Sequence, residues 1–105
     1  MPAFADIALF AERADEVAAM LKALANRARL MVLCQLVERG EMRVGELVEA
    51  VGLSQSALSQ HLAKMREEGL LAFRRDGKEV FYRIADARCE ALLSTLHTLY
   101  CSEEK

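Results

Sequence analysis

The sequence predicts a mainly α-helical fold that carries one small β-hairpin. Apolar residues recur at three- and four-residue steps along most of the chain, which is the spacing of amphipathic helices. Two of these helical patterns are joined by the tight turn Gly52-Leu53-Ser54, as in a helix-turn-helix. The later stretch "LLAFRRDGKEVFYRI" alternates around Asp76-Gly77 instead, which is a strong signal for a two-residue hairpin turn.

Length and composition limit what the chain can be. Its 105 residues suffice for one compact domain, which we expect to span residues 1–105, and an apolar content of 53% predicts an ordered fold. The net charge of −2 gives no overall attraction to nucleic acids or anionic membranes, so DNA binding would need local basic patches. No apolar run approaches the roughly 18 residues of a membrane span, and no secretion signal is visible. We therefore expect a cytoplasmic protein without membrane contact.

The first three predicted helices lie within residues 7–51. The first is one long amphipathic helix, with apolar positions at Ile7, Phe10, Ala14, Val17, Leu21 and Leu24. Asn26 can cap the second helix, Arg27 to Arg39, and Gly40 stops it. A short third helix follows over about Val44 to Val51 and precedes the tight turn.

The fourth predicted helix separates an apolar face from a polar one. Ser54 can cap this helix and Gly69 ends it. Its buried stripe is formed by Leu58, Leu62 and Met65. At 100° per residue, the opposite side carries Ser56, Ser59, Gln60 and Ala63. Short polar groups on such a face can read base edges in the major groove, although a polar helix face on its own is more often simply solvated.

The predicted hairpin is basic near its tip. With Asp76-Gly77 as the turn, its inner face consists of Leu71, Phe73, Val80, Tyr82 and Ile84. Basic side chains by the tip can contact the DNA backbone or an adjacent minor groove, whereas a basic tip alone is more often protection against edge-to-edge aggregation. In this order, the polar helix and the basic hairpin favour a DNA-binding protein. The candidate DNA contacts are Gln55, Ser56, Ser59, Gln60, Lys64, Arg74, Arg75 and Lys78.

The last predicted helix completes the fold. Asp86 can cap it, and it runs to about Cys101. Its apolar side carries Leu92, Leu96 and Leu99. The predicted order is therefore α-α-α-α-β-β-α, a winged helix-turn-helix with helices at both ends.

The three cysteines differ in their helical phase. None forms a C-x-x-C pair, so neither thioredoxin-like chemistry nor a four-cysteine zinc site is expected. Cys89 falls in the middle of the apolar stripe of the last helix, which predicts a small buried residue. Cys101 lies off that stripe, so core packing does not explain why a cysteine occupies this position. Cys34 shares a face with apolar residues of the second helix, and phase alone leaves open whether it fills the core or has a function.

Three stretches together resemble the ArsR/SmtB family of small bacterial repressors. They are "LKALANRARLMVL", "VGELVEAVGLSQSALSQHLAKMREEGLL" and "RRDGKEVFYRI", and the likeness covers nearly the whole chain. The resemblance implies a homodimer joined through the first and last helices. It also implies binding to a palindromic operator in double-stranded DNA, and an inducer that releases the repressor.

The metal-binding motifs of that family are missing from the sequence. Where one subgroup has cysteine-valine-cysteine, this chain has Arg43, Val44 and Gly45, which provide no thiol for a soft metal. Where another subgroup begins its last helix with aspartate-x-histidine, this chain has Asp86-Ala87-Arg88, and arginine is not a ligand. We therefore expect no metal site and no cofactor.

The positions of two cysteines resemble those of the dithiol subgroup, the regulators of the BigR, SqrR and HlyU type. In that pattern one cysteine lies in the second helix and one near the end of the last, which corresponds to Cys34 and Cys101. The resemblance implies that these thiols sense reactive sulfur species such as persulfides, or oxidants. A disulfide or polysulfide link between them would then weaken DNA binding, and Cys89 would not take part.

Other functions remain as alternatives. A metal-responsive or cysteine-independent repressor of the same family is the first, and measurements of bound zinc and thiol reactivity distinguish it. A thiol enzyme is not expected, because the sequence contains neither a Cys-His-Asp arrangement nor a glycine-rich oxyanion loop. A winged-helix interaction module that does not bind DNA would not need Arg74, Arg75 and Lys78 in its hairpin.

Overall fold

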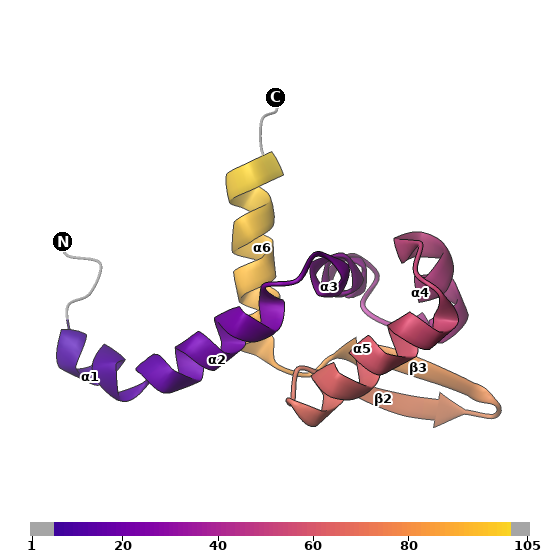
Figure 1. The fold of residues 1–105 in the computed structure, drawn as a ribbon, viewed down its shortest axis with the longest axis horizontal. Helices are drawn as coiled ribbons and strands as arrows, with labels where there is room; N and C mark the ends of the chain where they lie inside the picture. The colour runs from indigo at the N-terminus through magenta and orange to yellow at the C-terminus, as the bar shows by residue number, and fades with distance from the viewer. Residues whose placement is uncertain (1–5, 102–105) are drawn as a thin grey trace.

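The computed structural model describes residues 6–101. Its elements are α1 (Ile7–Glu12), α2 (Ala14–Leu24), α3 (Arg27–Arg39), β1 (Met42–Arg43), α4 (Val44–Val51), α5 (Gln55–Glu67), β2 (Leu71–Asp76), β3 (Glu79–Ile84) and α6 (Ala87–Cys101). Figure 1 shows that α1 and α2 extend away from a body formed by α3, α4, α5 and the hairpin, while α6 projects from the region where α2 and α3 meet. Among the described residues, no helix is long and apolar enough to span a membrane. The predicted winged helix-turn-helix is confirmed.

The core lies where α3, α4, α5, the sheet and the start of α6 meet. The predicted stripe of α5 is buried, with Leu58 and Met65 at 0% and Leu62 at 1% relative exposure. Cys89 is fully buried as predicted. The complete set of buried apolar residues is Leu24, Val32, Leu33, Leu36, Met42, Leu47, Leu58, Leu62, Met65, Leu70, Leu71, Cys89 and Leu93.

The predicted caps are present. The side chains of Asn26 and Ser54 each accept a hydrogen bond from the backbone N–H three residues on, at 3.1 Å. The carboxylate of Asp86 accepts from the N–H two residues on, at 2.9 Å. Gly40 and Gly52 end α3 and α4 with φ of 85° and 83°, values that glycine adopts without steric cost.

The first predicted helix is divided, so the prediction of one long helix over residues 7–24 is wrong. Arg13 separates α1 from α2 with φ −104° and ψ 3°. Its N–H bonds to the carbonyl of Phe10, three residues back, at 2.9 Å. None of the residues of α1 is buried. Helices draw most of their stability from tertiary packing, and within residues 6–101 α1 has no buried residue that would favour one continuous helix with α2.

The hairpin turn lies one residue further along than predicted. Asp76 pairs with Glu79, so the two turn residues are Gly77 and Lys78 rather than Asp76 and Gly77. Gly77 has φ 65° and Lys78 has no positive φ, which is the pattern of a type II′ turn with glycine first. Moving the turn by one residue shifts the strand pairing by two, which keeps the same side chains on the inner face.

A third strand, β1, was not predicted. Met42 and Arg43 pair antiparallel with Tyr82 and Phe81, which gives the strand order β1-β3-β2. A two-residue strand is too short to show alternation in the sequence. It connects the end of α3 directly to the hairpin, and its Met42 is completely buried.

Two glycine substitutions test the assigned turn. Gly77→Ala should lower the free energy of unfolding by about 1 kcal/mol, because alanine disfavours a positive φ. Gly45→Ala, within α4, should raise it by about 0.5–1 kcal/mol through helix propensity. A Cβ at either position would meet nothing within 4 Å, so only backbone conformation distinguishes the two variants. Urea unfolding at a fixed protein concentration measures both, and equal effects would contradict the turn.

Candidate functional site

The polar face of α5 is open to solvent. Gln55, Ser56, Ser59 and Gln60 are exposed, as are Ala63 and Lys64 further along the same helix. Within residues 6–101, no side-chain hydrogen bond or ion pair engages the four serine and glutamine residues. Their donors and acceptors are therefore free to meet a ligand. The buried stripe on the other side of α5 fixes the direction in which this polar face points.

The basic residues of the hairpin lie on its two different faces. Arg74 lies opposite Phe81 and Arg75 lies opposite Val80, so their side chains alternate. Arg74 donates two hydrogen bonds to the carboxylate of Glu41, at 2.8 and 2.9 Å, and its guanidinium lies 4.5 Å from the centroid of Phe81. These hydrogen bonds hold the pKa of Glu41 below its usual range. The charge of Arg74 is therefore largely offset, and Arg75 does not share this arrangement.

Two ion pairs connect α3 to the polar helix and to the hairpin. At its N-terminal end, Arg29 donates to Glu68 at 3.3 Å, directly after α5, and to the carbonyl of Ala23 at 3.2 Å. Only 14% of the Arg29 side chain is exposed, so this pair is better shielded from water than a typical surface pair. At the other end, Glu41 follows the last turn of α3 and holds Arg74. Both candidate DNA-contacting elements are thus attached to one helix.

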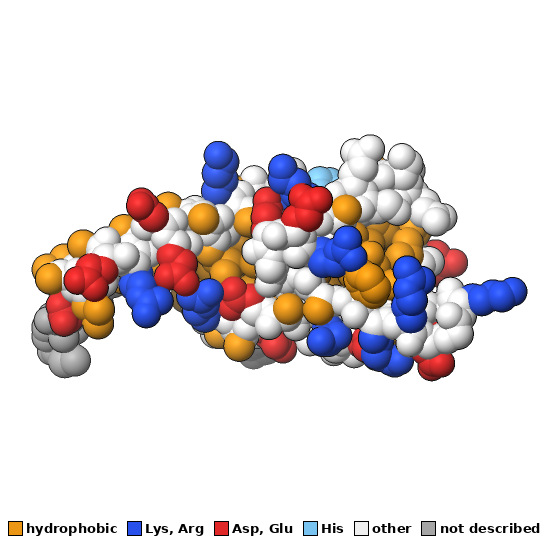
Figure 2. Space-filling model, turned by 90° about the horizontal axis from the view of Figure 1, so that it is seen from below, with side chains coloured by type: hydrophobic (Ala, Val, Ile, Leu, Met, Phe, Trp, Pro, Cys, Tyr) orange, Lys and Arg blue, Asp and Glu red, His pale blue; other side chains and the backbone are white. Residues whose placement is uncertain are grey.

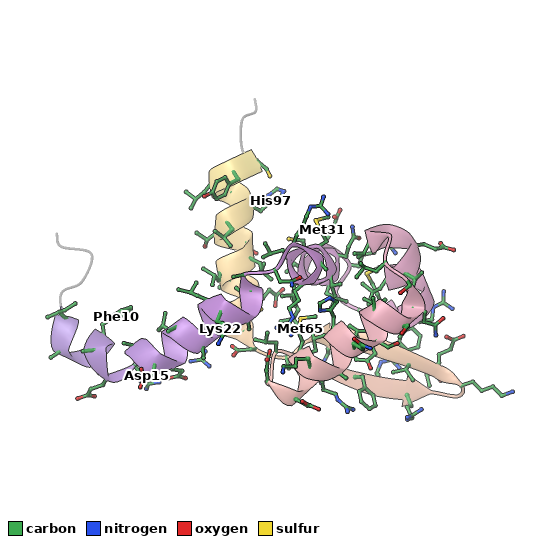
Figure 3. All side chains as sticks on the ribbon, in the orientation of Figure 1. Phe10, Asp15, Lys22, Met31, Met65 and His97 are labelled. Carbon is green, nitrogen blue, oxygen red and sulfur yellow. The ribbon has the colours of Figure 1, made fainter. Side chains whose placement is uncertain are left out.

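A groove of about 450 Å³ lies between α3 and α6, which pack against each other. Figure 3 shows His97 on the side of α6 that faces α3. The residues that line this groove are Cys34, Gln35, Val37, Glu38, Leu93, Ser94, His97 and Thr98. Cys34 is exposed in it, so the question that helical phase left open is answered: Cys34 does not fill the core.

The three thiols have different surroundings. The groove walls partly desolvate the sulfur of Cys34, which raises its pKa, and the charge of Cys101 raises that pKa further. Cys101 is exposed at the end of α6, as predicted. Burial raises the pKa of Cys89 to about 11, which leaves this thiol unreactive at neutral pH.

The start of α6 carries a cluster of ion pairs instead of a metal-binding motif. The guanidinium of Arg88 lies 2.7 Å from a carboxylate oxygen of Glu16 and 3.2 Å from one of Asp86. Its hydrogen bonds hold the pKa values of both carboxyls below their usual range. Across the described part of the chain, no group of three or more His, Cys, Asp or Glu side chains is placed to hold a metal ion.

Comparison with known proteins relates this chain to bacterial regulators. The family model "Bacterial regulatory protein, arsR family" matches residues 26–72. The biofilm growth-associated repressor of Xylella fastidiosa is 46% identical over 94 residues, which cover 90% of this chain and 82% of that protein. The transcriptional activator HlyU of Vibrio cholerae is 48% identical over 82 residues, which cover 78% of this chain and 75% of that protein.

Solved structures agree with the sequence comparison. The transcriptional repressor BigR from Xylella fastidiosa superposes with a TM-score of 0.87 at 42% identity, covering 93% of this chain and 99% of that one. Reduced HlyU from Vibrio cholerae gives a TM-score of 0.82 at 42% identity, covering 89% of this chain and 97% of that one. The likeness therefore includes the terminal helices as well as the central domain.

The raised pKa of Cys34 leads to a testable pH dependence. Only the thiolate reacts with iodoacetamide, so the labelling rate of Cys34 should keep rising above the ordinary thiol pKa of about 8.5. Cys101→Ser should shift this profile to lower pH, because it removes one cause of the raised pKa. Mass spectrometry of the labelled peptides measures both rates. Cys89 is the internal control and should be labelled only after unfolding. A Cys34 rate that levels off at or below pH 8.5 would contradict the assignment.

Proposed function

The chain belongs to the ArsR family of DNA-binding transcriptional regulators, and we propose that it is a repressor that reactive sulfur species release from its operator. The observation that supports the sensing part is the exposure of two thiols on two helices that pack against each other: Cys34 on α3 and Cys101 at the end of α6. The related proteins BigR and HlyU place the chain in the BigR/HlyU-like subgroup of the family.

In this proposal, α5 reads the operator. Its short side chains Ser56, Ser59 and Gln60 meet base edges in the major groove, with Gln55 at the start of the helix. Lys64 and the hairpin contact phosphates. On the hairpin, Arg75 and Lys78 provide charges that no ion pair within residues 6–101 offsets, whereas Arg74 would have to leave Glu41 to reach DNA.

A homodimer is the form that would bind a palindromic operator. Large apolar side chains on the terminal helices support it, because Ile7, Leu21, Leu99 and Tyr100 are 65%, 52%, 71% and 81% exposed. A mainly apolar groove of about 400 Å³ also lies between α2 and α6. A second copy that covers these surfaces would place two α5 helices roughly 34 Å apart, one turn of DNA.

The sensing chemistry needs only the persulfide as oxidant. One thiolate of the pair attacks the outer sulfur of an alkyl persulfide, RSSH, which becomes a thiol as the protein gains a persulfide. The second thiolate then attacks the protein-bound sulfur of that persulfide, and hydrosulfide leaves. The products are RSH, hydrogen sulfide and a Cys34–Cys101 disulfide, so two protein thiols are oxidised and one sulfane sulfur is reduced.

Because the link joins α3 to α6, it acts on the helix that holds both DNA-contacting elements. Arg29 ties α3 to the end of α5, and Glu41 ties it to the hairpin. A change in the angle between α3 and α6 would therefore alter how the two halves of the dimer present their α5 helices.

Substitution of the polar face tests base reading. Ser56→Ala, Ser59→Ala or Gln60→Ala should weaken binding to an operator selected from a random duplex pool by about 1–3 kcal/mol. Binding to random-sequence DNA should change little, because phosphate contacts remain. Thr95→Ala on α6 is the matched control for an exposed polar position. Fluorescence anisotropy measures both affinities, and unchanged operator binding in all three variants would remove α5 from base reading.

Serine substitution of the thiols tests sensing. Cys34→Ser and Cys101→Ser should bind the selected operator when reduced, yet remain bound when an alkyl persulfide releases the parent. Cys89→Ser should be released like the parent, although it should be less stable because a hydroxyl replaces a buried thiol. Mass spectrometry should find the bridge of the parent within one chain. Release of the Cys34→Ser/Cys101→Ser variant as readily as the parent would refute the proposal.

A further inference from the structure

The ring of Phe73 carries two arginine side chains from different elements. The guanidinium carbon of Arg66, near the end of α5, lies 4.8 Å from the ring centroid, and that of Arg75, on β2, lies 5.7 Å from it. Tyr82 on β3 packs against the same ring, with centroids 5.6 Å apart and planes at 52°. The ring of Phe73 therefore contacts one basic side chain from α5 and one from the hairpin.

These two arginines differ from Arg74 in how their charge is used. Neither Arg66 nor Arg75 forms an ion pair with a carboxylate within residues 6–101, whereas Arg74 pairs with Glu41. A cation–π contact fixes the position of a guanidinium and leaves its positive charge available. Figure 2 shows Lys and Arg side chains around a hydrophobic patch at the end of the molecule that carries the hairpin.

We propose that Phe73 is a positioning residue for DNA binding, which holds Arg66 and Arg75 as a phosphate-contacting pair between α5 and the hairpin. This inference rests on the proposed function. Arginine loses considerable side-chain entropy when it is fixed against a phosphate, so a side chain that is already ordered on a ring binds at a lower cost. Such a pair fits the DNA phosphates that lie between the major groove read by α5 and the groove next to the hairpin.

Phe73→Leu tests the proposal because leucine keeps an apolar side chain and removes the aromatic face. Affinity for random-sequence duplex DNA should fall about fivefold, since cation–π contacts contribute to the placement of two charges. The dependence of log K on log salt should become less steep, toward the slope of an Arg66→Gln/Arg75→Gln variant, which loses about one unit for each phosphate contact. Phe73→Tyr keeps the aromatic face and should resemble the parent.

The same hairpin offers a matched control. Phe81→Leu removes the ring beneath Arg74, whose charge Glu41 already offsets, so the salt slope should stay at the parent value. When Phe73→Leu is combined with Arg66→Gln/Arg75→Gln, DNA affinity should fall little further, because the charges that the ring positions are already absent. The positioning role would be overturned if Phe73→Leu kept the salt slope of the parent. It would also be overturned if the affinity losses of Phe73→Leu and Arg66→Gln/Arg75→Gln were fully additive in the combined variant. A parent that binds no duplex DNA would instead refute the proposed function.

A second measurement needs no substitution that risks the fold. In the free parent protein, the ring current of Phe73 should move the side-chain δ-proton resonances of Arg66 and Arg75 upfield in NMR spectra. The δ-protons of Arg39, which has no aromatic contact among the described residues, provide the reference. Unshifted resonances for both arginines would show that the ring does not hold them in solution, and the proposal would fail.

Discussion

The apolar face of α3 is the constraint on which the rest of the structure depends. Val32, Leu33 and Leu36 are 0–1% exposed, and the helix packs against α4, α6 and β3. Closely packed interiors do not deform smoothly, so elements attached to α3 move with it rather than independently. The opposite side of the same helix exposes Cys34. In the proposed mechanism, a covalent event at this thiol would act on a helix that an ion pair connects to the end of α5 and whose end lies next to Glu41, the partner of the hairpin residue Arg74.

Ion pairs with nearby carboxylates determine which basic side chains of this acidic chain keep a positive charge that is not offset. The net charge is −2, so overall electrostatics do not favour DNA. The hairpin divides its arginines by strand alternation, with Arg74 neutralised by Glu41 on one face and Arg75 beside an aromatic ring on the other. A count of basic residues along the hairpin treats these two alike. The three-dimensional arrangement gives them different surroundings.

The sequence predicted what depends on local patterns and missed what depends on partners distant in the chain. The Ser54 cap and the stripe with Leu58 follow from spacing alone, and both are confirmed. The break at Arg13 arises because α1 buries nothing within the chain, which helical periodicity does not reveal. The pairing of Arg74 with Glu41 spans 33 positions and depends on β1, a strand too short to recognise from sequence. Exposure of Cys34 likewise depends on how α6 packs against α3.

The proposed cross-link also limits how DNA release can occur. A bond between Cys34 and Cys101 would close a loop of 66 intervening residues (101 − 34 − 1). In the chain-entropy model, a closure of this size destabilises the unfolded state by about 4 kcal/mol, so the linked protein would be more stable, not less. Loss of operator binding would then come from a changed arrangement of folded elements rather than from unfolding. The ion pairs at the two ends of α3 provide the connection through which such a change would reach α5 and the hairpin.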